Sequence, residues 1–162
     1  MNVFDEVVAA NVSFAATPPP RLDAVPSRRL AVVTCMDARI DVFAALGLHD
    51  GEAHILRNAG GVVTKDMIRS LSISQRLLGT TAVAVIGHTD CGMTKTTDEQ
   101  FAAAVASEVG TEPPWPALTF PDVEARVRES VDTLRADPFL PHRDAIRGFV
   151  YDVDTGQLRT VT

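Results

Sequence analysis

Three short apolar runs, separated by stretches of helical character, constrain the fold of this chain more than any other feature. The runs are "RLAVVT", "AHILR" and "TAVAVIGH", and the third is apolar without alternation, as in a strand that is covered on both faces. The helical stretches "IDVFAALG" and "TKDMIRSLSISQRLLG" lie between them. The order strand, helix, strand, helix, strand predicts an α/β domain with a central, mostly parallel β-sheet flanked by helices.

The sequence also marks where its helices begin and end. The helix over residues 64–79 is expected to stop at Gly79 and to have as its inner face Met67, Ile68, Leu71, Leu77 and Leu78. A later helix, "TDEQFAAAVASEV", has a capping-box start, either Thr96 with Glu99 or Thr97 with Gln100, and Gly110 follows it. Another helix is expected to start at Pro121, and the end of the chain is expected to form either a terminal hairpin or a last strand and a tail.

The first residues are set apart from this pattern by prolines. Residues 5–14 predict a short helix, and the stretch "ATPPPRLDAVPS" after it is stiff and extended. A helix held away by such a connector cannot bury much of its apolar side against its own chain, so we expect an arm that packs on a second subunit, with a frayed terminus as the alternative. We therefore divide the chain into a helical arm and Pro-rich connector, residues 1–28, and an α/β domain, residues 29–162.

Length, charge and cysteine content narrow the class of protein. A chain of 162 residues is long enough for one compact domain. The net charge of -6 and the lack of a Lys/Arg block argue against nucleic acid as a partner, and no run approaches the roughly 18 apolar residues of a membrane span. Only two cysteines occur, which does not resemble a disulfide framework, so we expect a cytoplasmic protein without a membrane partner.

Both cysteines follow predicted strands. Cys35 ends the first strand, and His88 and Cys91 follow the third, so the parallel arrangement brings them to one crevice. Two thiols and an imidazole suit zinc, one ion per chain, and three protein ligands leave a fourth position for water or substrate. On the residues alone, the alternative is that both thiols are small buried hydrophobic groups and that His88 is a hydrogen-bonded core residue.

Two charged residues step away from the first cysteine in "TCMDAR". Asp37 can accept a hydrogen bond from a zinc-bound hydroxide, or it can occupy the fourth position itself. A carboxylate beside a hydroxide repels it, and a bidentate contact from Arg39 would offset that repulsion. A surface salt bridge or a helix-start cap is the alternative for this pair.

The segments "CMDARIDV", "RNAGG" and "GHTDCGM" resemble the signature segments of the beta-class carbonic anhydrases, and the small size resembles their prokaryotic branch. The resemblance runs from about Ala31 to Met93. It implies zinc on Cys35, His88 and Cys91, with Asp37 and Arg39 as catalytic residues. It also implies a homodimer or a dimer of dimers with a cleft lined from both subunits, and substrate contacts from Asn58, Ala59, Gly60, Gly61 and Gly92.

The expected activity is the zinc-dependent, reversible hydration of carbon dioxide to bicarbonate and a proton, by attack of zinc-bound hydroxide. One alternative is a hydrolase of carbon disulfide or a related heterocumulene on the same zinc site. The other is a non-catalytic zinc or redox-thiol binding module. His49, His54 and Trp115 are expected to be structural residues rather than members of the site.

Overall fold

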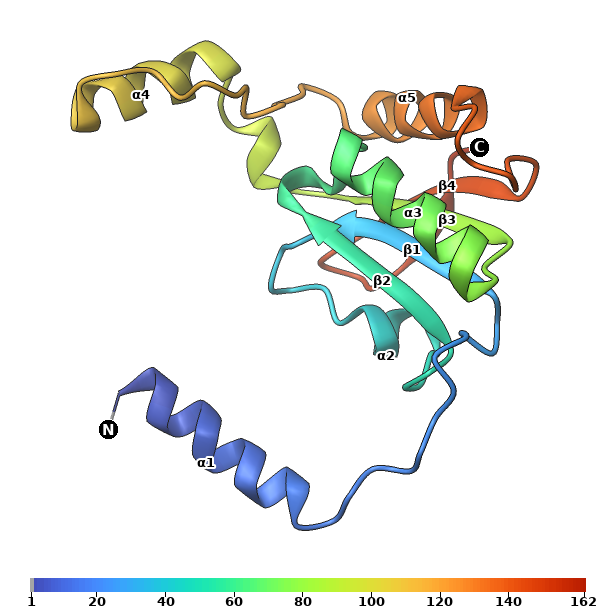
Figure 1. Ribbon diagram of the computed structural model, residues 1–162. Helices are drawn as coiled ribbons and strands as arrows, with labels where there is room; N and C mark the ends of the chain where they lie inside the picture. Colours follow the sequence, from blue (N-terminus) through green and yellow to red (C-terminus); the bar gives the residue numbers. More distant parts are fainter. Residues whose placement is uncertain (1) are drawn as a thin grey trace.

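The central element of the fold is a five-stranded sheet, seen in a computed structural model that describes residues 2–162 (Figure 1). The strands are β1 (Leu30–Cys35), β2 (Ala53–Asn58), β3 (Ala82–His88), β4 (Ile146–Tyr151) and β5 (Leu158–Thr160), in the order β2-β1-β3-β4-β5. The pairs β1–β2, β1–β3 and β3–β4 are parallel, and β4–β5 is an antiparallel hairpin. The predicted α/β class, with a mostly parallel sheet, is confirmed.

Helices cover both faces of the sheet. On one face, α3 (Lys65–Leu78) and α5 (Val123–Ala136) pack on β1, β3 and β4 through a buried aliphatic cluster that includes Met67, Leu71 and Leu134. On the other face, α2 (Val42–Leu46) and its flanking loops close a second cluster, to which both cysteines belong. The candidate ligands therefore lie inside a packed core, where their positions are restricted by neighbouring side chains.

Helix ends follow the local signals closely. Gly47, Gly79 and Gly110 take up the left-handed conformation at the ends of α2, α3 and α4 (Asp98–Val109). Of the two capping boxes considered for α4, the observed one joins Thr97 to Gln100. The last long helix starts later than expected, because the Asp122 side chain accepts a hydrogen bond from the amide of Ala125 and so makes Asp122 the N-cap in place of Pro121.

The predicted inner face of α3 is wrong at one position. Leu77 is 75% exposed, whereas Ser74 and Gln75 are each only 4% exposed. Leu77 lies six residues after Leu71, about 120° around the helix from it, so it falls outside the buried stripe. Ser74 and Gln75 enter the core because both find partners, Ser74 in Thr80 and Gln75 in the backbone of His142.

Two helices stand away from the body in Figure 1: α1 (Val3–Ala15), beyond its extended connector, and α4. Neither contains a buried residue. In α1 the exposed apolar side chains are Val3, Phe4, Val7, Val8, Val12 and Phe14, each more than 60% exposed. Within residues 2–162, none of the helices combines the length and the apolar character that a membrane crossing requires.

Candidate metal centre

Cys35, His88 and Cys91 meet at one edge of the sheet. Because β1 and β3 are parallel neighbours, with Thr34 paired to Ile86, their carboxyl ends reach the same place. The two sulfurs and a nitrogen of the imidazole all lie within 4.8 Å of one another, and all three side chains are buried. Within residues 2–162, no other group of three His, Cys, Asp or Glu side chains brings its ligand atoms this close together. The geometry suits one ion with three protein ligands.

The imidazole of His88 tests whether this cluster fits a metal. Its Nδ1 lies 2.8 Å from the carbonyl oxygen of Thr89, which can only accept, so Nδ1 carries the proton. Nε2 is therefore left with a free lone pair, and it is buried without a hydrogen-bond partner. An unpartnered buried nitrogen is costly, and a coordinated cation would satisfy it. The donor set, two sulfurs and one imidazole nitrogen, is one that zinc prefers.

The two sulfurs are arranged so that one of them ionises easily. A hydrogen bond from Cys91, opposed in part by burial and helped by the neighbouring imidazole of His88 and by the backbone amides of Asp37 and Gly60, lowers the pKa of the Cys35 thiol to about 4. The same contact, together with burial, raises the pKa of the Cys91 thiol. A cation between the sulfurs would replace the proton that they share and hold both as thiolates.

The turn of residues 58–61 forms one wall of the site. The Asn58 side chain bonds both the amide and the carbonyl of Val62 at 2.8 Å, which fixes the turn η1 (Ala59–Gly61). Gly61 has a φ of +62°, and a Cβ on it would lie 2.8 Å from the carbonyl carbon of Thr34 and 2.9 Å from the nitrogen of Cys35. Only glycine therefore allows the turn to rest on the end of β1.

Asp37 and Arg39 form the bidentate pair that the sequence predicts. Arg39 Nε lies 3.0 Å from Asp37 Oδ1, and Nη2 lies 2.8 Å from Oδ2. These hydrogen bonds, with one from the Arg39 amide, hold the pKa of the Asp37 carboxyl well below its usual range. Oδ2 also lies 3.8 Å from Nε2 of His88, so the carboxylate borders the cluster. An ionised carboxylate beside the ligands can accept a hydrogen bond from a molecule bound there.

Comparison with known proteins gives the family. A model of the carbonic anhydrase family matches residues 30–115. Beta-carbonic anhydrase 1 of Mycobacterium tuberculosis (strain H37Rv) is 48% identical over 162 residues, which cover all of this chain and 99% of that protein. The chain belongs to the beta-carbonic anhydrase family.

Further relatives agree with this chain in fold or in sequence. The crystal structure of a carbonic anhydrase from Streptococcus mutans superposes with a TM-score of 0.95 at 43% identity, covering 100% of this chain and 99% of that one. A carbon disulfide hydrolase from Acidianus sp. is 37% identical over 86% of this chain and 80% of its own length. Beta-carbonic anhydrases are zinc enzymes, and here Cys35, His88 and Cys91 are the residues that could hold the ion.

Two arginine contacts around this beta-carbonic anhydrase site are missing from the sequence prediction. Arg57, on β2, donates to the carbonyl oxygens of Cys35, Asp37 and Ile40, at 2.8, 2.6 and 3.2 Å, and so fixes the loop after β1. Arg39 has a second carboxylate partner, Asp90, at 2.9 Å. Arg57 and Asp90 stand in the segments "RNAGG" and "GHTDCGM", and this place, with the position of Asp90 between two candidate ligands, is the only signal that the sequence carries for them.

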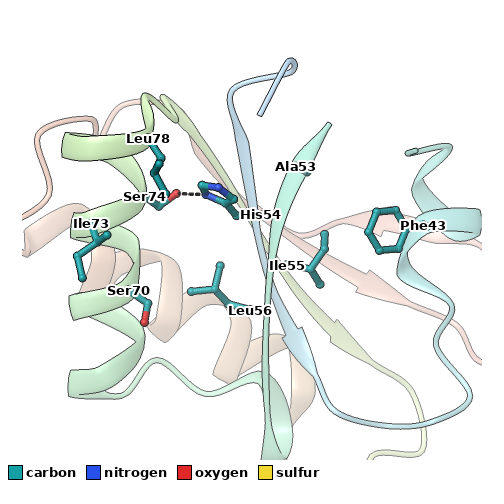
Figure 2. A pocket seen from close by; sticks show the side chains of 9 residues that line it. All are labelled: Phe43, Ala53, His54, Ile55, Leu56, Ser70, Ile73, Ser74 and Leu78. Carbon is teal, nitrogen blue, oxygen red and sulfur yellow. Dashed lines mark hydrogen bonds between the residues drawn. The ribbon is translucent and has the colours of Figure 1, made fainter. Parts of the chain in front are cut away.

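The remaining residues considered from the sequence lie elsewhere. His49 is at the surface beside Glu52, and Trp115 packs at 6.1 Å from the ring of Phe101. His54 lines an apolar groove of about 450 Å³ between α3 and β2, where its ring bonds Ser74 at 2.7 Å (Figure 2). These placements agree with structural roles for His49, His54 and Trp115.

Gly92 has open space where a Cβ would stand, so it has no steric reason to be glycine.

Proposed function

We propose that this beta-carbonic anhydrase catalyses the reversible hydration of carbon dioxide to bicarbonate and a proton. The observation that carries the proposal is the buried cluster of Cys35, His88 and Cys91, with the unpartnered Nε2 of His88 facing the carboxylate of Asp37. It stands in a chain that is 48% identical to a beta-carbonic anhydrase over its whole length.

The three ligands would be Sγ of Cys35, Nε2 of His88 and Sγ of Cys91. When bound there, zinc would supply a Lewis acid that makes a water molecule acidic enough to act as a nucleophile near neutral pH. The protein's part is to present three ligands and no more, since the cluster contains no fourth cysteine or histidine. That leaves room for a small molecule at the site.

Asp37 would orient the nucleophile rather than deprotonate it. Its pKa lies well below the usual range, so the carboxylate stays ionised and is a weak base at neutral pH. Oδ2 accepts from Nη2 of Arg39 and keeps a second lone pair, which can accept a hydrogen bond from the attacking oxygen beside His88 and so fix its orientation. Arg39 bonds both oxygens of the carboxylate and offsets its charge. Asn58, Ala59, Gly60, Gly61 and Gly92 are proposed to border the substrate.

A stopped-flow assay with an indicator dye, run beside a metal count, tests this function. We expect one zinc per chain and fast hydration. Because two thiolates offset the charge of the ion, the rate should climb as the pH rises above neutrality. A flat rate from about pH 6 to about pH 9 would contradict this expectation.

The relatives that hydrolyse carbon disulfide give the second candidate. The Acidianus protein is 37% identical over 86% of this chain, which is lower than the 48% of the Mycobacterium tuberculosis carbonic anhydrase over the whole chain. Turnover of the two gases by the same zinc-loaded preparation separates the candidates. Zinc-loaded protein that turns over neither gas would instead favour a non-catalytic zinc or redox-thiol module.

We propose that a second copy of the chain covers the apolar face of α1, with residues 1–28 as an arm and residues 29–162 as the catalytic domain. Support comes from six exposed apolar side chains on a helix that buries nothing in its own chain. The body offers apolar surface in return, in the groove along the edge strand β2, which is lined by Ile73 of α3 on one side of the strand and by Phe43 of α2 on the other (Figure 2). The assembly would be a homodimer or a dimer of dimers.

The compartment proposed for this protein is the cytoplasm. Both cysteines are free, and the proposed site needs them as thiolates, which a reducing compartment preserves. Fractionation of cells that express the chain, with an antibody against it, tests this proposal. Recovery in an oxidising compartment would contradict it.

A further inference from the structure

Arg39 is held along two edges of its guanidinium group. The edge formed by Nε and Nη2 faces Asp37. The edge formed by Nη1 and Nη2 faces Asp90, with Nη1 at 2.9 Å from Oδ2 and Nη2 at 3.0 Å from the main-chain oxygen. A planar group bonded along two edges cannot rotate without breaking both pairs of bonds.

Asp90 is itself fixed from two directions. Its second carboxylate oxygen lies 2.8 Å from Nζ of Lys95. Its backbone has a φ of +51°, a left-handed conformation that Asp and Asn tolerate better than other side chains. Asp90 stands between His88 and Cys91 in the sequence, so its backbone shapes the loop that carries these two residues. The same residue presents two hydrogen-bond acceptors to Arg39.

The position of Asp37 gives this arrangement a consequence. Oδ2 of Asp37 lies 3.8 Å from the unpartnered Nε2 of His88, close enough for a small movement to bring the carboxylate into the place left for a small molecule. Arg39 is the group that holds the carboxylate back. Asp90 in turn determines where Arg39 stands.

We infer that Asp90 is a positioning residue that ties the Asp37–Arg39 pair to the ligand loop and keeps Asp37 beside the metal position rather than in it. The inference rests on the proposed function. Asp90 acts through Arg39 and touches no reacting atom. With Asp90 in place, the fourth metal position stays open, and without it Asp37 occupies that position in part of the molecules.

Two substitutions of Asp90 test how strongly it holds the Asp37–Arg39 pair. Asp90→Asn keeps the backbone conformation and one acceptor but removes the charge, and Asp90→Gly keeps the conformation and removes the side chain. Because these ion pairs are about half exposed, we expect kcat/KM to fall by about threefold to fivefold in Asp90→Asn, and further in Asp90→Gly. Asp66→Asn is the matched control, since Asp66 forms an exposed pair with Arg69 on α3.

The deciding readout is structural. In crystals of the zinc-loaded Asp90→Gly protein, an Asp37 oxygen should lie at ligand distance, about 2.0–2.2 Å from the ion, in part of the molecules. The zinc content and the urea midpoint should match those of the unsubstituted protein. Asp37 still paired to Arg39 in every molecule, or kcat/KM values equal to that of Asp66→Asn, would overturn the inference. A lack of hydration by the unsubstituted, zinc-loaded protein would instead overturn the proposed function.

Discussion

The α1 arm and the sheet body differ in the exposure of their apolar side chains. In the body, Val32, Val33 and Leu71 are fully buried, and a zinc-binding cluster is built into the same core. In the arm, Phe4 is 77% exposed and nothing is buried. The comparison indicates that one chain is sufficient to gather the ligands, whereas the apolar side chains of the arm are not covered by their own chain.

The largest expected effect comes from removing a metal ligand in the sheet body. His88→Ala removes the only nitrogen ligand, so zinc should be lost and the hydration rate should fall by more than roughly 1,000-fold. A metal count and stopped-flow assay measure both. His49→Ala, at an exposed loop histidine, is the control. Retention of zinc and of activity in His88→Ala would refute the proposed ligand set.

The next effect concerns the charge pair beside the ligands. Arg39→Ala removes the bidentate partner of Asp37, which should then bind the ion and close the site, with a loss of about 100-fold in kcat/KM. A crystal structure of the zinc-loaded variant checks the cause. Arg69→Ala, which breaks an exposed pair on α3, serves for comparison. An intact water ligand in the Arg39→Ala crystal would defeat the explanation.

The arm is tested by one charge on its apolar face. Phe4→Glu should weaken self-association by about tenfold or more, because a carboxylate would have to be buried against the second copy. Sedimentation velocity over a range of concentrations measures this change. Ser13→Glu adds the same group nine residues further on, on the opposite side of the helix. If both variants associate as the unsubstituted protein does, α1 is not part of an interface.

A glycine comparison sharpens the account of the turn. Gly61→Ala would strain a positive φ and press on the backbone of β1, so it should cost about 3 kcal/mol of unfolding free energy. Gly92→Ala meets open space and should change that free energy by less than about 0.5 kcal/mol. Urea unfolding measures both. Equal costs would contradict the close approach, and lost activity in Gly92→Ala at unchanged stability would support its substrate role.

The smallest effect is expected where α4 joins the body. The hydroxyl and amide of Thr119 donate to Asp98 and lower the pKa of its carboxyl. A group whose pKa is lower in the folded state stabilises the fold above its unfolded pKa, and this contribution disappears as the pH falls through the folded value. The urea midpoints of Asp98→Asn and the unsubstituted protein should therefore differ near neutral pH and converge in acid. A difference that persists in acid would contradict this account.

Local signals in the sequence are sufficient to predict much of this fold. Apolar runs locate β1, β2 and β3, and Gly47, Gly79 and Gly110 end their helices, because each effect acts within a few residues. The alternation of strands and helices predicts a parallel sheet, whose carboxyl ends bring the cysteines and His88 together. Elements that are determined by residues close together in the sequence can therefore be predicted from it.

Side-chain contacts that do not follow from the arrangement of the strands could not be predicted. Asp90 meets Arg39 across 51 positions of sequence, and Arg57 reaches three carbonyl groups of another strand's loop. Leu77 was expected inside because it is apolar, but the partners available to Ser74 and Gln75 decide which side of α3 is buried. Such choices depend on what lies opposite a residue, which its neighbours in sequence do not specify.

The hydrogen bond from His88 Nδ1 to the carbonyl of Thr89 fixes the tautomer of the imidazole through the main chain alone. That peptide is held in turn by β4, since the Thr89 amide donates to the carbonyl of Tyr151 at 2.9 Å. No neighbouring side chain is needed to aim the nitrogen at its ion. Side chains beside this imidazole, other than the ligands Cys35 and Cys91 and the carboxylate of Asp37, can therefore be substituted without changing its tautomer, as long as β4 stays in register.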